Sequence, residues 1–136
     1  MNFLLDTNAC IALMEPDVNP VQSRFVRVVR KGSEVFVSSI AAFELWYGVF
    51  KSSRIIQNGQ KIQKFLSGSY SLVPFDEVDA RLAGEIRASL EAIGRPIGSY
   101  DLLMAAQAMN RKMTLVTANV SEFSRVKGLD WQDWSK

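Results

Sequence analysis

Short apolar runs rich in β-favouring residues recur along the chain, and segments with helical spacing separate them. We predict strands over residues 3–5, 35–37, 70–75 and 113–117. Strands that alternate with helices in this way are typical of an α/β fold with a mostly parallel sheet flanked by helices. The sequence therefore predicts an α/β protein.

The helical segments carry recognisable start and stop signals. Besides a helix directly after the first strand, we predict helices over residues 21–31, 41–50, 55–66, 77–93 and 101–109. The clearest covers 77–93, where apolar residues recur at helical spacing between an Asp76 N-cap and a Gly94 stop. Pro16, Asn19 and Pro20 predict a loop before the basic helix. Trp131 and Trp134 alternate with acidic residues near the end, which predicts a short edge strand.

The length of 136 residues with 48% apolar residues predicts one domain over residues 1–136. No uncharged apolar run approaches the ~18 residues that a membrane span needs. The apolar opening segment lacks a basic start and carries Asp6 in its middle, unlike a signal peptide. We therefore expect a soluble, cytoplasmic protein.

Missing residue types exclude several kinds of site. The chain has no His, which excludes Ser-His-Asp and Cys-His hydrolysis and every His-ligated zinc site. Cys10 is the single cysteine, and its apolar surroundings predict a buried, inert thiol. No nucleotide-binding glycine motif and no nucleophile elbow occurs. The available chemistry is that of carboxylates, hydroxyls, Lys and Arg.

Three carboxylates are isolated in apolar stretches. Asp6 is the only charge in residues 1–14, Glu44 the only one in 35–50 and Asp101 the only one in 96–110. An unpaired buried carboxylate is costly unless a cation or strong donors surround it. Any one of the three could be a helix cap or part of a distant ion pair, but three together favour a site.

The positions of these residues along the predicted elements strengthen that reading. Asp6 and Asn119 follow strands, and Asp101 begins a helix just past the turn at residues 94–98. In parallel α/β sheets such positions meet at the carboxyl edge of the strands. We therefore predict an acidic pocket there, with Mg²⁺ as cofactor and Mn²⁺ able to substitute. Carboxylate-held Mg²⁺ serves phosphoryl chemistry.

Positive charge is concentrated in the middle of the chain. Residues 18–75 hold eight bases against Glu34 and Glu44. The bases form two groups that could flank the acidic pocket and hold a phosphate backbone: Arg24, Arg27, Arg30 and Lys31, then Lys51, Arg54, Lys61 and Lys64. The same pattern also fits helix faces that are simply solvated.

Five segments follow one another along the chain: LLDTN at residues 4–8, SSIAAFELWYG at 38–48, GRPIGSYDLLMAA at 94–106, LVTANVSEF at 115–123 and GLDWQDW at 128–134. In this order and spacing they resemble the PIN-domain ribonucleases, specifically the VapC-type toxins of bacterial toxin–antitoxin pairs. The resemblance implies a Mg²⁺-dependent endoribonuclease that cleaves RNA by metal-activated water. The RNA it implies is tRNA or rRNA.

The resemblance also assigns residues and partners. It implies Asp6, Glu44 and Asp101 as acidic metal ligands, with Asn119 at the family's fourth catalytic position, where it would position water or phosphate. It implies a homodimer and a cognate VapB-like antitoxin whose peptide lies across the pocket. Because Asn carries no charge, three negative charges remain, which favours one well-held ion in the absence of RNA.

Three other functions stay open at this stage. The chain could be a non-enzymatic module that binds nucleic acid or a partner, with structural carboxylates. It could be an RNA-processing nuclease without an antitoxin. A phosphatase with Asp6 as nucleophile is a weak alternative, because Asn8 stands where its second Asp is expected. Metal-dependent RNA cleavage without a phosphoenzyme would separate these alternatives.

Several residues near the motifs have ordinary structural interpretations. We predict Phe43 and Phe50 in the core, and Trp46 and Tyr47 in the core or an interface rather than stacked on RNA. Thr7 and Thr117 carry hydroxyls that could orient water, but Thr is also common at strand ends. Glu122 is expected to be exposed or to cap a helix.

Overall fold

The computed structural model describes residues 1–136 and contains one parallel sheet with the strand order β3-β2-β1-β4-β5. The strands are β1 (Asn2–Leu5), β2 (Glu34–Ser38), β3 (Ser71–Val73), β4 (Thr114–Val116) and β5 (Trp131–Gln132). The helices are α1 (Thr7–Met14), α2 (Pro20–Arg30), α3 (Ser39–Lys51), α4 (Ile55–Leu66), α5 (Glu77–Ala92), α6 (Ser99–Asn110) and α7 (Val120–Phe123).

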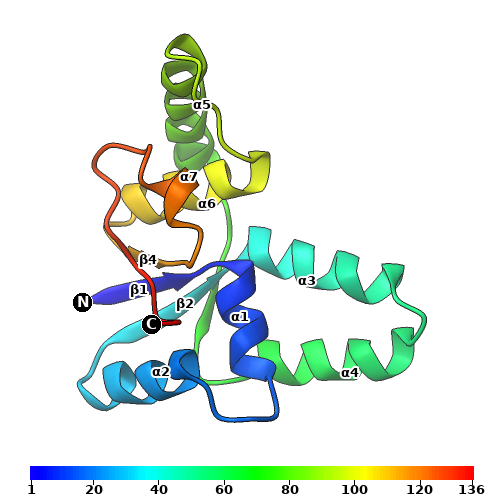
Figure 1. Cartoon of the computed structure of the whole chain (residues 1–136). Helices are drawn as coiled ribbons and strands as arrows, with labels where there is room; N and C mark the ends of the chain where they lie inside the picture. Colours follow the sequence, from blue (N-terminus) through cyan, green and yellow to red (C-terminus); the bar gives the residue numbers. More distant parts are fainter.

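The strand order determines which helices cover which face of the sheet. From β1 the chain moves to β2 and then β3 in one direction, and it returns across the sheet to β4. Because parallel crossovers are right-handed, α1 to α4 share one face, and α5 and α6 cover the other. Figure 1 shows this arrangement, with the α3–α4 hairpin and α5 projecting away from the sheet.

The predicted α/β fold is confirmed, and the differences lie at element ends. Helix α5 begins after Asp76, whose side chain forms a reciprocal capping box with Asp79. Gly94 ends the helical segment with a positive φ of 69°. Pro20 is the first residue of α2 rather than part of the loop, because proline is favoured where a helix needs no N–H donor. The third strand is shorter than predicted and covers only Ser71–Val73.

The core lies on both faces of β1, the central strand, and of its neighbour β4. Phe3, Leu4 and Leu5 of β1 are all buried, as is the whole of β4. Trp134 packs its ring edge-on against Phe3, at 5.1 Å between centroids. Cys10 is buried and unpaired as predicted, and burial raises the pKa of its thiol. This packed centre of the sheet fixes the position of the residues that directly follow the carboxyl ends of β1 and β4.

One buried carboxylate away from that edge belongs to a structural network. Asp79 of α5 is fully buried and accepts hydrogen bonds from Asn110 at 2.8 Å and from Arg111 at 3.1 Å. It also accepts from the backbone N–H of Asp76 at 3.0 Å. Burial alone would raise the pKa of Asp79, but these donors and the Arg111 charge outweigh burial and lower it. The network joins α5 to the end of α6.

No helix in the structure combines the length and the apolar character that a membrane crossing requires.

Candidate functional site

Asp6 lies at the junction between β1 and α1. It is the N-cap of α1, and its Oδ1 accepts a hydrogen bond from the backbone N–H of Ala9 at 2.7 Å. Its own N–H continues the ladder to β4 by donating to the carbonyl of Val116. The side chain is 5% exposed, and burial raises its pKa although Ala9 and Thr117 donate to it. The fold therefore fixes this carboxylate between the ends of β1 and β4.

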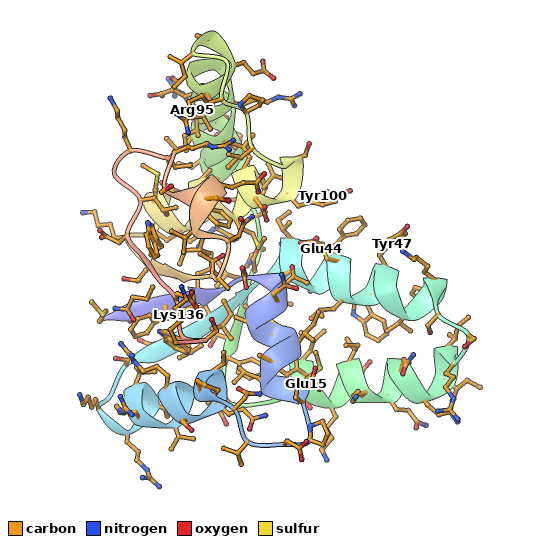
Figure 2. All side chains as sticks on the ribbon, in the orientation of Figure 1. Glu15, Glu44, Tyr47, Arg95, Tyr100 and Lys136 are labelled. Atoms are coloured by element: carbon orange, nitrogen blue, oxygen red, sulfur yellow. The ribbon has the colours of Figure 1, made fainter.

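Glu44 reaches the same region from α3, which directly follows β2. Its Oε1 accepts a hydrogen bond from the hydroxyl of Thr7 at 2.6 Å. Thr7 is the first residue of α1 and the neighbour of Asp6, so this bond ties the second carboxylate to the first. Figure 2 shows Glu44 in the first half of α3, on the side of that helix that faces the start of α6.

Asp101 and Asn119 meet at the other side of the same edge. Asp101 lies in the first turn of α6, and Asn119 immediately precedes α7. The amide Nδ2 of Asn119 donates to Asp101 at 3.2 Å and to Glu122 at 2.7 Å. Its backbone N–H donates to Thr117 Oγ1 at 3.0 Å, which fixes the turn after β4. The amide therefore lies between two carboxyl groups.

Glu122 holds the start of α6 from outside that helix. Gly98 is the N-cap of α6 and offers no side chain, and its backbone N–H donates instead to Glu122 Oε1 at 3.2 Å. The pKa of Glu122 is lowered first by a hydrogen bond that it accepts from the Asp101 carboxyl group, and further by those from Asn119 and Gly98. Of the two expectations for Glu122, exposure or helix capping, the structure shows a half-buried side chain that binds the start of α6, 24 residues away in the sequence.

The acidic groups repel one another across the site. Burial is the largest cause that raises the pKa of Asp101, followed by the hydrogen bond and the negative charge of Glu122. The charges of Asp6 and Glu44 raise it further. Four carboxyl groups from separate segments therefore lie within electrostatic reach of one another. This is the environment in which functional carboxylates are found.

The structure brings together Asp6, Glu44, Asp101 and Asn119, the four residues predicted from the sequence. Each carboxylate is bonded to its own donor, and no three acidic side chains converge tightly enough to hold an ion as they stand. Their catalytic and metal-binding roles stay a prediction.

Thr7, Thr117 and Glu122 have a larger part in the site than predicted from the sequence. Both hydroxyls contact site carboxylates, and Glu122 contacts both Asn119 and Asp101. The sequence did contain one signal for Glu122. It lies three residues after Asn119, and residues three apart lie on the same face of a helix.

A groove leads away from the site along the α3–α4 hairpin. It encloses about 370 Å³ between α1, α3 and α4, with Thr7 and Glu44 at one end. Ile11, Leu45 and Ile62 are among its apolar lining residues, whereas Lys61 adds a positive charge. The groove thus joins an apolar channel to the acidic edge.

The prediction that Phe43 and Phe50 lie in the core is wrong. Phe43 is 50% exposed, Tyr47 59% and Phe50 66%. Spacings of four and three residues put all three on one face of α3, whereas Ala41, Leu45 and Val49 face the core. Phe43 also packs edge-on against Tyr100, with 5.4 Å between ring centroids. An exposed aromatic stripe of this kind indicates an interaction surface.

Comparison with known proteins gives a consistent result. The sequence model of the PIN domain matches residues 3–129. The tRNA(fMet)-specific endonuclease VapC of Shigella flexneri is 37% identical over 135 residues, covering 99% of each chain. Ribonuclease VapC2 of Rickettsia felis is 35% identical over 136 residues, covering 100% of each.

Solved structures agree over the full length. The VapBC2 crystal structure from Rickettsia felis, bound to a promoter DNA fragment, superimposes with a TM-score of 0.89 at 34% identity, covering 98% of this chain and 99% of that one. The DNA-bound VapBC structure from Salmonella typhimurium gives a TM-score of 0.87 at 34% identity, covering 98% of both chains.

Proposed function

This chain belongs to the PIN domain family and resembles its VapC members over its whole length, and we propose that it is a metal-dependent endoribonuclease, the toxin of a toxin–antitoxin pair. One observation carries the proposal. Asp6, Glu44, Asp101 and Asn119 come from four separate segments and gather at one edge of the sheet. Such a group of carboxylates, isolated in apolar sequence, has no structural pairing with Lys or Arg within the chain.

The donor set fits a hard divalent cation. With no His in the chain and Cys10 buried, the candidate ligands are oxygen atoms, which favours Mg²⁺, with Mn²⁺ able to substitute. The repulsion that raises the pKa of Asp101 is what a bound cation would relieve. Asp6 and Asp101 would hold the ion, with Glu44 as a direct or water-mediated ligand. When bound, Mg²⁺ supplies activation of water and stabilisation of charge on phosphate oxygens.

The surrounding residues orient this group. Thr7 holds Glu44, while Thr117 holds both Asp6 and the turn that carries Asn119. The Asn119 amide is a neutral donor beside Asp101, so it suits a phosphate oxygen or the attacking water. The substrate is RNA, and we propose tRNA or rRNA, consistent with the tRNA named for the Shigella flexneri relative.

The partner is an antitoxin related to VapB, as the VapBC structures of the relatives suggest. Its peptide would lie in the groove between α1, α3 and α4 and reach the acidic edge at Glu44. A peptide with apolar residues and a basic group would match the apolar lining and the carboxylates. Occupying this groove would keep RNA from the site.

We further propose a homodimer through the aromatic stripe Phe43, Tyr47 and Phe50. Exchanging Tyr47 and Phe50 together for Glu should raise the dimer dissociation constant at least about a hundredfold, because buried aromatic anchors at interfaces contribute about 2 kcal/mol or more each. Sedimentation equilibrium measures the constant.

The matched control for this experiment is the double exchange of Val18 and Val26 for Glu, since both are exposed and lie away from the stripe. It should leave the dimer intact. A stripe variant that dimerises as tightly as the wild type would show that the interface lies elsewhere.

The function itself is tested by mapping new RNA ends in total RNA after brief expression. Wild-type chain should produce ends at defined sites, and Asp6→Asn should produce none. Co-expression of the antitoxin should suppress them. A wild-type chain that binds RNA without generating ends would favour the non-enzymatic binding module instead.

A further inference from the structure

A second cavity, lined by basic residues, lies on the α2 side of the sheet. It encloses about 380 Å³, and its polar lining residues are Arg24, Arg27, Lys31, Ser33 and Gln132. No acidic residue lines it. The arginines and the lysine follow helical spacings of three and four residues, so they share one face of α2. Three positive charges therefore converge on one cavity.

Nothing within the chain neutralises these charges. The salt bridges of the structure involve only Arg87 and Arg111 as cations, so Arg24, Arg27 and Lys31 have no acidic partner. Arg27 lies in the last turn of α2 and Lys31 caps its end, where the helix dipole favours cations. Arg24 lies a turn earlier, outside that effect. The dipole therefore does not account for all three.

The pocket sits toward the amino ends of the strands. Met1 and Ser33, which precede β1 and β2, line it beside the three bases, and Gln132 at the end of β5 borders it on the other side, whereas Asp6 follows the carboxyl end of β1. The four residues of β1 span about 13 Å at roughly 3.3 Å per residue. Figure 1 shows the same separation, with the chain's N-terminus and the end of α2 at one side and the start of α1 at the other. The expectation that these bases flank the acidic pocket is therefore wrong.

We propose that this pocket is a phosphate-contact site for RNA, separate from the site of cleavage. The proposal rests on the proposed ribonuclease function. Guanidinium groups bind phosphate oxygens through paired N–H donors, and the Ser33 hydroxyl and the Gln132 amide add neutral donors. An RNA that fills both sites has to extend at least about 13 Å, or about four stacked nucleotides at roughly 3.4 Å each. Folded RNA meets that requirement, and a dinucleotide does not.

The experiment compares two triple variants that remove the same charge. In the pocket variant Arg24, Arg27 and Lys31 become Gln. In the control variant Arg30, Arg81 and Arg95 become Gln; these residues lie outside the pocket and form no salt bridge. RNA affinity is measured against salt concentration with bulk tRNA as probe, in an Asp101→Asn background so that bound RNA is not cleaved. Thermal melting verifies that both variants fold.

The pocket variant should bind tRNA more weakly and lower the slope of log affinity against log salt by about 2 to 3 units, since each phosphate contact contributes about 0.7 to 0.9. The control variant should change the slope by less than about one. With Asp101 restored, the pocket variant should raise KM for tRNA and leave kcat unchanged. Cleavage of a dinucleotide should be unaffected.

Other outcomes overturn the proposal. If both triple variants lose the same tRNA affinity, RNA is attracted by the overall positive charge and not by this pocket. If the pocket variant binds tRNA as the parent does, the pocket serves another anion or an acidic partner. A fall in kcat on the dinucleotide would place these bases in the reacting site. Failure of the proposed function looks different, because wild-type chain would then cleave neither substrate.

Discussion

We expect Asp101→Asn to lower the rate of RNA cleavage about a thousandfold, which corresponds to about 4 kcal/mol of lost transition-state stabilisation. The exchange keeps the shape of the side chain but removes one negative charge from the candidate ion site. In the metal-free chain the same exchange should not reduce the free energy of unfolding. Burial and the charges of Glu122, Asp6 and Glu44 all raise the pKa of Asp101, so a neutral side chain suits this position.

Asp6→Asn should behave in the same way. Asn is as good an N-cap as Asp, so the start of α1 is retained while the charge is lost. Asp17→Asn is the control, because Asp17 is exposed in the loop before α2 and should affect neither activity nor stability. Initial cleavage rates and urea unfolding at neutral pH measure both effects. If Asp101→Asn unfolds the chain and the folded fraction keeps its specific activity, the carboxylate is structural.

The second large effect is on stability, far from the site. Arg111→Met should reduce the free energy of unfolding by about 3 kcal/mol at neutral pH, because it leaves the buried Asp79 without its charged partner. Asn110 and the backbone N–H of Asp76 still donate to Asp79, which places the loss at the low end of the usual range. Urea unfolding measures the loss.

At acid pH the free energies of unfolding of the wild type and of Arg111→Met should differ less than at neutral pH. The folded-state pKa of Asp79 lies below its ordinary value of 3.8, so the stabilisation is complete above pH 5 and is lost as the pH falls below about 4. Arg87→Met is the matched control, since the Arg87–Glu91 pair at 3.1 Å is exposed on α5. It should cost less than about 1 kcal/mol. Equal losses from both exchanges would contradict a special role for the buried pair.

Much of the fold could be predicted because local signals agreed with the tertiary arrangement. The Asp76 cap and the Gly94 stop determine α5 without reference to other elements. The strand runs could be identified because each is apolar and short, and their alternation with helices predicts parallel pairing. The third strand was predicted too long, since Pro74 after Val73 ends the ladder there.

The aromatic residues of α3 show what sequence alone could not decide. Phe43, Tyr47 and Phe50 are as apolar as the core residues between them, and only the packing of α3 against α4 and the sheet determines which face is buried. Helix α3 carries more apolar residues than a single stripe facing the core requires. The additional, exposed ones indicate a surface that binds a partner.

The candidate site was predictable for a related reason. Asp6, Glu44 and Asp101 are conspicuous because their neighbours are apolar, and parallel strands bring their carboxyl ends to one edge. The supporting contacts were not predictable in the same way. The bonds from Thr7 to Glu44 and from Gly98 to Glu122 join residues 37 and 24 positions apart. Such pairings depend on how the helices pack over the sheet.

The location of the α2 bases was the largest error of the sequence-based prediction, whereas Lys61 of α4 does line the groove that holds Glu44. Charge along the sequence showed that the middle of the chain is basic, but not toward which end of the sheet α2 would point its bases. Because α2 runs back toward the start of β2, its last turn and its C-cap carry Arg27 and Lys31 toward the amino ends of β1 and β2. The end of the sheet at which these bases lie depends on how the chain crosses from β1 through α2 to β2, and the composition does not show this.

The most direct test of the account is the rate at which the purified chain cleaves RNA before chelation, after chelation and after Mg²⁺ is restored. We predict that a chelator stops cleavage, that Mg²⁺ or Mn²⁺ restores it, and that no covalent phosphoenzyme accumulates. Cleavage that continues unchanged in the chelator would contradict the proposed role of Asp6, Glu44 and Asp101, as would a folded chain that cleaves no RNA with either metal.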